Sequence, residues 1–338
     1  MHVTLYKPGK IPIPPKLYGG SERIIYWLGK ALVKLGHRVT LIARAGSHIP
    51  GAELRTPASD KKNPQAWLNL IPVSTDIVHF HEHPRGPVAK PYLLTIHGNG
   101  APGEQFPPNT VFVSQRHAAN HGSRHFVHHG LDPEDYWFSE KREDYALFLA
   151  KARWKVKNFH GAAAVARRAG LELRVIGSRN WPLGLHRWLP RIRGVRYYGM
   201  IGEPEKQELL SRARCLIFPV RWEEPFGVSV IEGLVSGAYV AATPYGSLPE
   251  IVAPETGVLS AKAAELAEAV KQPQRFSPSA CRDRVLRGGF THLDAARKYL
   301  ECYERVLTRG SLGDDGDPAP ATRPGFKAKR LLPWDEGV

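Results

Sequence analysis

The chain has 338 residues, more than one hydrophobic core usually organises, so two domains of roughly 150 residues each are expected. Its 42% hydrophobic and 23% charged residues are an ordinary globular composition and exclude a disordered or fibrous protein. The net charge of +15 favours an anionic partner, with a generally basic solvated surface as an equal alternative.

The cysteines and the apolar segments indicate the compartment. Cys215, Cys281 and Cys302 lack the close spacing of zinc or redox motifs, which fits a reducing environment. The N-terminal residues predict a strand rather than a signal peptide, and no apolar run approaches the roughly 18 residues of a membrane span. We therefore expect a cytoplasmic protein. The basic charge leaves peripheral attachment to the anionic inner face of a membrane open.

The first part of the chain alternates predicted strands and helices. Residues 2–6 form a short apolar run, and after a loop rich in Pro and Gly, apolar residues recur at helical spacing over 24–35. Ser21 is the expected helix N-cap and Gly36 the stop signal, and residues 38–43 predict the next strand. Further strands, buried on both faces of a parallel sheet, are predicted at 77–80, 92–96 and 110–113.

The same alternation restarts after a loop near residues 132–144. The predicted strands of this second part are 145–150, 172–176, 214–220 and 238–242. The predicted helices between them are 158–169, 203–212 and 227–236. Two doubly wound α/β units are therefore expected.

These elements predict the domain limits. The N-terminal domain is expected at 1–135 and the C-terminal domain at 136–290. An amphipathic helix follows at 291–308. The remaining tail, 309–338, is rich in Gly, Asp and Pro, and we expect it to be poorly ordered.

Two glutamates bracket the most informative segment, Glu-Pro-Phe-Gly-Val-Ser-Val-Ile-Glu at 224–232. It follows a predicted strand and opens a predicted helix, and in open α/β sheets a helix N-terminus at a strand end offers backbone N–H groups to a phosphate. Glu224 and Glu232 would accept hydrogen bonds from sugar hydroxyls at two ends of one ligand, while the N–H groups of Gly227 and Val228 face a diphosphate. A capping carboxylate with a solvated helix glutamate is the plainer alternative.

This segment resembles the E-x7-E signature of retaining GT-B glycosyltransferases of family GT4. The likeness covers nearly the whole chain and continues through Gly237, Thr243, Pro244, Gly246, Pro249, Glu250 and Gly257. It implies a GT-B fold of two Rossmann-like domains, with the C-terminal helix crossing back to the N-terminal domain. It also implies that Glu224 contacts hydroxyls of the donor sugar, that Glu232 contacts the ribose hydroxyls of the nucleotide, and that Ser229 belongs to the donor-binding helix start.

A basic segment, Lys-Ala-Arg-Trp-Lys-Val-Lys at 151–157, directly follows a predicted strand. Cations at a strand exit could neutralise a pyrophosphate and stabilise its departure. In the family this segment has Gly-Arg, a short loop and Lys-Gly. Aligned on Lys157, the family's arginine falls on Lys151 and its second glycine on Asn158. Either Lys151 or Arg153 supplies the first charge, and Lys157 is expected on phosphate. A plain basic loop is the alternative.

Three more segments in the first half carry candidate residues: the loop before the first helix and two strand ends. Gly19 and Gly20 permit positive φ and close approach of backbone to ligand, and their place resembles the family's loop that faces the donor phosphate, although a bare Gly-Gly pair is more often a turn. His97 resembles the family's histidine that approaches the transferred sugar. Arg116 places a cation near the same crevice, with a solvated helix start as the equal alternative.

The sequence does not favour a metal. The histidines at 79, 81 and 83 would share one strand face, but neither a carboxylate pattern nor a CxxC partner accompanies them. No DxD-like pair occurs where a divalent ion would be needed. We therefore expect neither a metal nor another cofactor.

Residues and resemblance together predict a retaining glycosyltransferase. It would move a hexose-type sugar from a nucleoside diphosphate sugar, a UDP-sugar first and a GDP-sugar next, to an acceptor that the sequence does not identify. The donor is expected on the C-terminal domain and the acceptor on the N-terminal domain, with closure excluding water. The rivals on the same fold are a nucleotide-sugar epimerase and a sugar phosphorylase. A nucleic-acid-binding protein is disfavoured because no recognition motif accompanies the basic charge.

Overall fold

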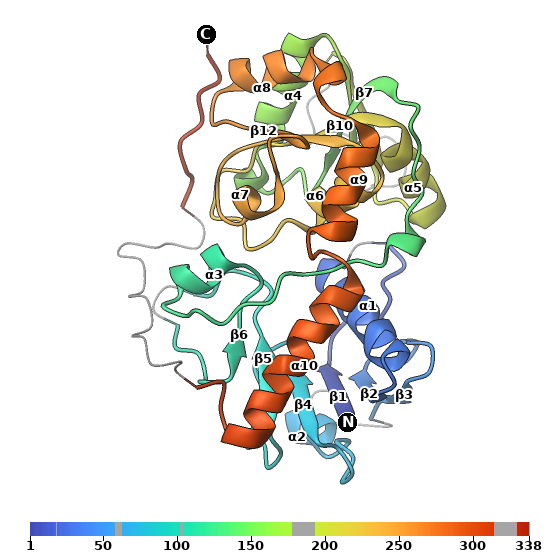
Figure 1. Cartoon of the computed structure of the whole chain (residues 1–338), viewed down its shortest axis with the longest axis vertical. Coiled ribbons are helices and arrows are strands. Elements are labelled where there is room, and N and C mark those ends of the chain that lie inside the picture. The colour runs from blue at the N-terminus through green and yellow to red at the C-terminus, as the bar shows by residue number, and fades with distance from the viewer. Residues whose placement is uncertain (18, 58–62, 102–103, 178–192, 314–329, 338) are drawn as a thin grey trace. The chain divides into compact units, whose positions relative to one another are not determined.

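The computed structural model describes residues 1–17, 19–57, 63–101, 104–177, 193–313 and 330–337 (Figure 1). These residues divide into two compact units. The first unit has its described residues in 1–132 and 289–313, and the second has them in 133–288 and 330–337. Each unit contains one 6-stranded sheet in which every strand pair is parallel.

The sheet of the first unit has the order β3-β2-β1-β4-β5-β6. Its strands are β1 (His2–Lys7), β2 (Arg38–Ala43), β3 (Glu53–Arg55), β4 (Ile77–Phe80), β5 (Tyr92–Thr95) and β6 (Thr110–Val111). Its helices are α1 (Gly20–Lys34), α2 (Pro64–Leu68), α3 (Gln115–Asn120) and α10 (His292–Arg309). Strands are added outward in both directions from β1 and β4, so the topological switch point lies between these two strands.

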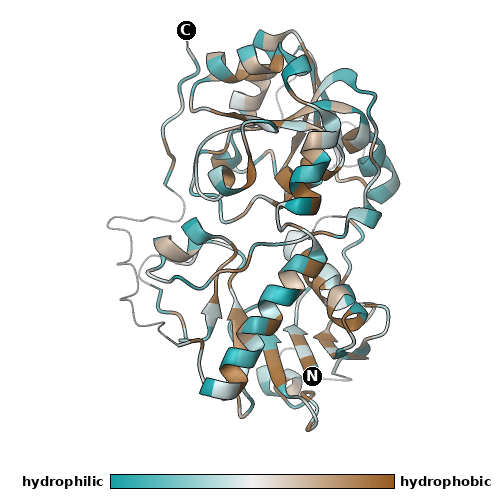
Figure 2. Cartoon of the chain, in the orientation of Figure 1, coloured by the Kyte–Doolittle hydropathy of each residue, from teal (hydrophilic) through white to brown (hydrophobic). Residues whose placement is uncertain are grey.

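Both faces of this sheet are buried. Successive residues of a strand point to opposite faces, so Leu5 joins one hydrophobic cluster and Tyr6 the other. The first cluster includes residues of α1 and α10, among them Tyr299 and Tyr303. The second includes Trp67 of α2. Figure 2 shows the hydrophobic character of these strands. The predicted C-terminal helix therefore packs in the first unit, as a GT-B fold requires.

The sheet of the second unit has the order β12-β11-β10-β7-β8-β9. Its strands are β7 (Glu143–Leu149), β8 (Glu172–Ile176), β9 (Val195–Gly199), β10 (Ala213–Phe218), β11 (Tyr239–Ala242) and β12 (Gly257–Leu259). Its helices are η1 (Pro133–Asp135), η2 (Lys155–Lys157), α4 (Phe159–Ala169), α5 (Glu203–Arg212), α6 (Val228–Val235), α7 (Leu248–Ile251), α8 (Ala263–Val270), η3 (Pro273–Arg275) and α9 (Pro278–Arg287).

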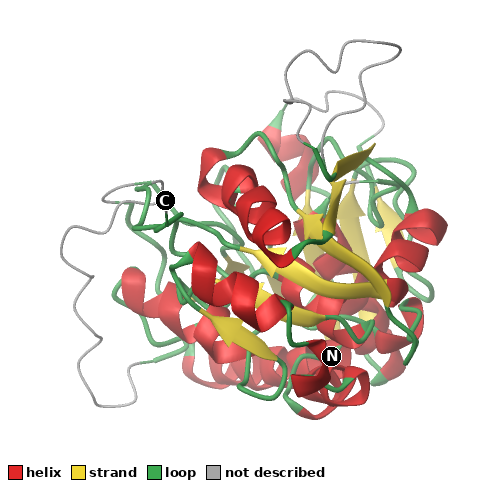
Figure 3. Ribbon diagram, turned by 90° about the horizontal axis from the view of Figure 1, so that it is seen from above, coloured by secondary structure: helices red, strands yellow, loops and turns green. Residues whose placement is uncertain are grey.

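Helices flank this second sheet. α4 packs beside α8, and α6 packs beside α5 and α9. Figure 3 shows strands in yellow among red helices. The switch point lies between β7 and β10, because β8 and β9 extend the sheet on one side of β7 while β10, β11 and β12 extend it on the other.

Two local predictions are corrected. Ser21 is not the N-cap of α1, which begins one residue earlier with Gly19 as its N-cap, and Ser21 Oγ instead donates to Glu22 Oε2 (3.1 Å). The predicted tail is packed over residues 330–337: Leu332 N donates to Arg221 O (2.8 Å), and Arg221 Nε donates to Leu332 O (2.9 Å). These two hydrogen bonds, one from the backbone of Leu332 and one from the Arg221 side chain, hold the segment on the second unit. Residues 314–329 and 338 lie outside the described residues.

Two loops at the carboxyl ends of β10 and β11 pack backbone against backbone. Gly246 has φ +64°, and a Cβ there would lie 2.2 Å from both the backbone N and the backbone O of Glu224. Ser247 N donates to Glu224 O (3.0 Å), and Ser247 Oγ donates to Phe226 O (2.6 Å). The loop after β11 therefore fixes the backbone that carries Glu224.

Gly246→Ala should destabilise the second unit by about 2–5 kcal/mol, because it adds left-handed strain to a steric overlap with the Glu224 backbone. Thermal unfolding measures the effect. The control is Gly202→Ser at the N-cap of α5, where a Cβ meets nothing within 4 Å and φ is −84°. Equal melting temperatures for the two variants would contradict the contact between the loops.

Candidate functional site

The two strand exits at the switch point of the second unit carry Lys157 and Glu224. Lys157 follows β7 and Glu224 follows β10, and these strands are neighbours in the sheet. Ligands of doubly wound sheets bind beyond the carboxyl ends of the strands at such a switch point. The topology therefore brings together the two strongest candidates from the sequence.

Lys157 and Glu224 form a buried ion pair. Lys157 Nζ lies 2.6 Å from Glu224 Oε2, and the two side chains are 12% and 7% exposed. Trp222 Nε1 donates to the same carboxylate oxygen (2.6 Å). Lys157 Nζ also lies 5.0 Å from the ring centroids of Phe218 and Trp222. Since burial removes water from both charges, each one depends on the other for compensation.

Asn158 fixes the backbone next to Lys157. It adopts the left-handed conformation with φ 53°, which Asn tolerates better than most residues, at the position where the family has glycine. Its side chain accepts from Gly161 N (3.2 Å) at the start of α4 and donates to Pro219 O (3.0 Å) beyond β10. The Asn158 side chain therefore links the two strand exits.

An aromatic pair lies beside these charges. The rings of Trp154 and Trp222 meet edge to face, with centroids 6.4 Å apart. Lys151 Nζ lies 4.5 Å from the centroid of the Trp154 ring, whereas the Arg153 side chain is exposed. Lys151 therefore belongs to the same cluster of aromatic and basic side chains as Lys157.

Glu232 is held by two residues that the sequence did not single out. It lies on α6 and is 7% exposed, and its Oε1 accepts from Lys206 Nζ (2.8 Å) and from Tyr136 OH (2.7 Å). One signal for Lys206 was present in the sequence. It shares a face of the predicted 203–212 helix with Leu209 and Leu210, and a lysine on an apolar face needs an anionic partner.

The start of α6 fits an anion. Gly227 is the N-cap, with φ 89° and ψ 60°, and it offers no side chain to cap the first turn. The backbone N–H groups of Val228 and Ser229 belong to that turn, where the helix dipole favours negative charge. The arrangement suits a phosphate oxygen approaching from the N-terminal side of α6.

The glycines predicted in the first unit differ from each other. A Cβ on Gly19 would lie 2.7 Å from Pro15 Cβ, whereas a Cβ on Gly20 would meet nothing within 4 Å. Gly19 is therefore required by packing, and only Gly20 has open space beside it. Tyr18 lies outside the described residues.

The exposed Arg116 lies at the start of α3. Ser114, the N-cap of that helix, accepts from His117 N (3.1 Å).

His97 lies in a row of histidines. Its Nε2 is 3.0 Å from His81 Nδ1, and its Nδ1 is 3.3 Å from His129 Nε2. The ring centroids of His79 and His81 are 4.1 Å apart. The two ring nitrogens of His79 form hydrogen bonds with Tyr303 OH and Thr95 Oγ1, both at 2.7 Å. Burial lowers the pKa of His79 and of His97 to about 3. These rings are therefore neutral near pH 7.

His83 does not join this row. β4 ends at Phe80, so His83 lies beyond the strand, and its Nε2 is 2.9 Å from Glu104 Oε1. The expectation of one strand face for residues 79, 81 and 83 is therefore wrong. Within the described ranges, no group of three or more His, Cys, Asp or Glu side chains is arranged to hold a metal ion.

Acid should destabilise the first unit. His79 and His97 have pKa values of about 3 when folded, below the ordinary 6.5, so the unfolded chain binds more protons between these values. Stability is thus fully present above about pH 6.5 and falls as the pH drops toward 3, by up to about 1.4 kcal/mol per pH unit for each ring.

Urea unfolding between pH 7 and 4.5 measures this slope. His79→Gln should make it shallower, while His160→Gln, which replaces an exposed histidine of α4, should leave it unchanged. A stability that stays constant over this range would contradict the prediction.

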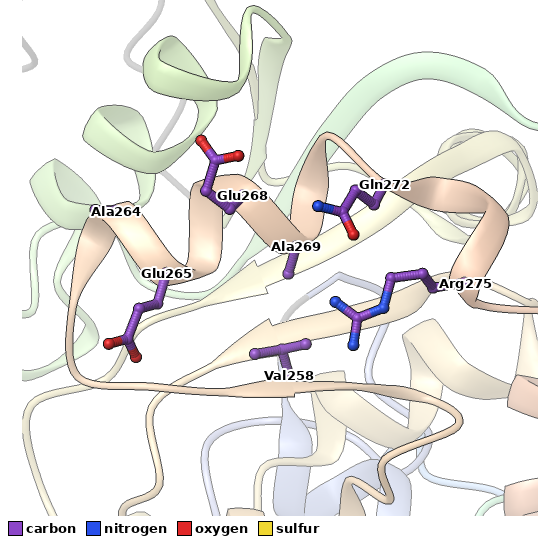
Figure 4. A pocket seen from close by; sticks show the side chains of 7 residues that line it. All are labelled: Val258, Ala264, Glu265, Glu268, Ala269, Gln272 and Arg275. Carbon is purple, nitrogen blue, oxygen red and sulfur yellow. The ribbon is translucent and has the colours of Figure 1, made fainter.

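A hollow beside α8 contains none of the predicted site residues (Figure 4). Val258 and Ala269 form apolar walls, and Glu265, Glu268 and Arg275 lie around it. We assign it no role in the site.

Cys215, Cys281 and Cys302 form no disulfide. Among the described helices, none combines the length and the apolar character needed to cross a membrane.

Residues 144–273 match the family model described as glycosyl transferases group 1. This stretch contains Lys157, Glu224 and Glu232, and it begins at the second residue of β7. This part of the second unit is therefore similar to the group 1 glycosyl transferases. No curated protein sequence matches the chain.

Solved structures share the fold over most of the chain. AviGT4, a glycosyltransferase involved in avilamycin A biosynthesis, has 24% identity and a TM-score of 0.76, covering 91% of this chain and 98% of its own. Sucrose-phosphate synthase from Thermosynechococcus elongatus has 16% identity and a TM-score of 0.65, covering 91% and 99%. HepE from Anabaena, in complex with UDP and glucose, has 14% identity and a TM-score of 0.64, covering 90% and 99%.

Proposed function

We propose that this protein is a retaining glycosyltransferase that transfers a hexose-type sugar from a nucleoside diphosphate sugar. The observation that carries the proposal is the buried Lys157–Glu224 pair at the switch point of a group 1 glycosyltransferase domain. A UDP-sugar is favoured over a GDP-sugar, and the similar fold of HepE, solved with UDP-glucose, supports that order.

A nucleotide sugar supplies a partner for each charge of the pair. In the proposal its diphosphate takes Lys157 Nζ, and hydroxyls of the sugar donate to Glu224 Oε2 in place of that ammonium group. The backbone N–H groups of Gly227, Val228 and Ser229 donate hydrogen bonds to further phosphate oxygens. The carboxylate of Glu232 receives the ribose hydroxyls.

The reaction follows from the same groups. The bond between C1 of the sugar and the phosphate oxygen breaks, and C1 bonds to the acceptor oxygen on the same face. The acceptor proton passes to the departing phosphate. Lys157, together with Lys151 or Arg153, stabilises the charge that develops on the diphosphate. These cations take the part that a metal plays elsewhere, so the proposed reaction needs neither a metal nor another cofactor.

Four residues of the first unit also have proposed roles. His97 approaches the transferred sugar as a neutral imidazole, and Gly19, Gly20 and Arg116 belong to the donor-binding set. The net charge of +15 supports an anionic acceptor, or attachment to the anionic inner face of a membrane. We propose the cytoplasm as the compartment.

UDP should raise the melting temperature of the full chain more than GDP does, because a ligand that binds only the folded state stabilises it. Transfer from a UDP-hexose should then require an acceptor, survive EDTA and keep the anomeric configuration of the donor, as read by NMR of the product. An inverted product would contradict retention. Conversion of the donor without an acceptor would favour the epimerase, and dependence on inorganic phosphate would favour the phosphorylase.

Lys157→Ala should lower kcat by about 100- to 1,000-fold, because it removes the cation that meets the leaving diphosphate. Lys155→Ala, which changes an exposed lysine of the same turn, is the matched control and should retain wild-type turnover. Thermal unfolding of both variants separates loss of catalysis from loss of structure. Wild-type turnover in a folded Lys157→Ala variant would refute the role of Lys157.

A further inference from the structure

The carboxylate of Glu232 is held from one side only. Lys206 Nζ and Tyr136 OH both donate to Oε1, at 2.8 Å and 2.7 Å. Oε2 accepts from none of the residues that the structure describes. One oxygen is therefore fixed by the protein, while the other stays available to a ligand.

Lys206 is the charge partner that this site requires. The side chains of Lys206 and Glu232 are each 9% exposed, so neither charge is well hydrated. A buried carboxylate is costly without a cation to compensate its charge, and Lys206 supplies that cation. Lys206 also pairs with Glu203 Oε1 (3.1 Å), which holds its ammonium group from a second direction.

Tyr136 helps to fix the orientation of the Glu232 carboxylate. Its hydroxyl donates to Glu232, and Lys206 Nζ lies 5.7 Å from the centroid of its ring. The next residue, Trp137, donates its backbone N–H to Gln207 Oε1 of α5 (3.3 Å). The segment after η1 is thus tied to α5, and both of these elements converge on one carboxylate oxygen of α6.

We propose that Lys206 and Tyr136 are positioning residues that make the site prefer ribonucleoside over 2′-deoxyribonucleoside diphosphates. This inference rests on the proposed function, in which Glu232 receives the ribose hydroxyls. With Oε1 engaged by two donors, the carboxylate does not rotate, so Oε2 presents a fixed acceptor to the sugar. Without these two donors, Oε2 of Glu232 is no longer held in position. The hydrogen bond from a ribose hydroxyl then adds little to the binding free energy, and the ribonucleotide and the deoxyribonucleotide bind about equally well.

Isothermal titration of the full-length protein with UDP and with 2′-deoxy-UDP tests the inference, using the corresponding guanosine pair if GDP proves the tighter ligand. The wild type should bind UDP about tenfold more tightly than 2′-deoxy-UDP, as expected for a hydrogen bond to a charged acceptor. Lys206→Met should lose most of this ratio through weaker UDP binding, with 2′-deoxy-UDP changed by about twofold or less. Tyr136→Phe should lose part of it.

Two further variants separate the possible outcomes. Lys271, which follows α8, forms an exposed ion pair with Glu268. Lys271→Met breaks this pair and should keep the wild-type ratio of UDP to 2′-deoxy-UDP affinity. Glu232→Gln should abolish the preference.

If Glu232→Gln abolishes the preference while Lys206→Met and Tyr136→Phe keep it, the positioning role is wrong and the proposed function stands. If Glu232→Gln itself keeps the preference, the ribose contact is wrong and the inference falls with it. Should Lys206→Met fail to fold, Tyr136→Phe decides, because it removes one hydroxyl and leaves both charges in place.

Discussion

The second unit depends on opposite charges brought together out of water. Lys157 and Glu224 follow two neighbouring strands. Lys157 Nζ lies 2.6 Å from Glu224 Oε2, beside the rings of Phe218 and Trp222. Removing either charge would leave the other buried without compensation, which is strongly unfavourable. A ligand that separates them must bring an anion to the lysine and hydrogen-bond donors to the glutamate. A sugar linked to a diphosphate carries both, which is the physical basis of the proposed function.

The same arrangement occurs a second time on α6. Glu232 pairs with Lys206 as Glu224 pairs with Lys157, so each glutamate of the E-x7-E segment has its own buried lysine. The two pairs differ in what a ligand would do to them. The proposed diphosphate displaces the first pair, whereas the second pair stays intact and presents a free carboxylate oxygen. The first therefore concerns the reaction, and the second concerns recognition.

Contacts of the surrounding backbone hold these charged residues in position. Asn158 connects the turn of Lys157 to the exit of β10, and Gly246 lets the loop after β11 contact the backbone of Glu224. These contacts use main-chain atoms and short side chains, which have little conformational freedom to lose. The site is thus supported by neighbouring strands of one parallel sheet, whose spacing is set by backbone hydrogen bonds.

The sequence by itself determined the alternation of strands and helices, because apolar periodicity is local. It predicted helix 203–212 and strand 172–176 with their observed bounds, and it singled out Glu224, Glu232 and Lys157. Only the tertiary structure decided the strand order, the pairing of Lys157 with Glu224 across 67 positions, and the convergence of Tyr136 and Lys206 on Glu232. It also decided that residues 330–337 pack on the second unit. Periodicity shows which face of an element is buried, but the partner on that face is chosen by strand order and by the electrostatics of burial, which a linear pattern does not contain.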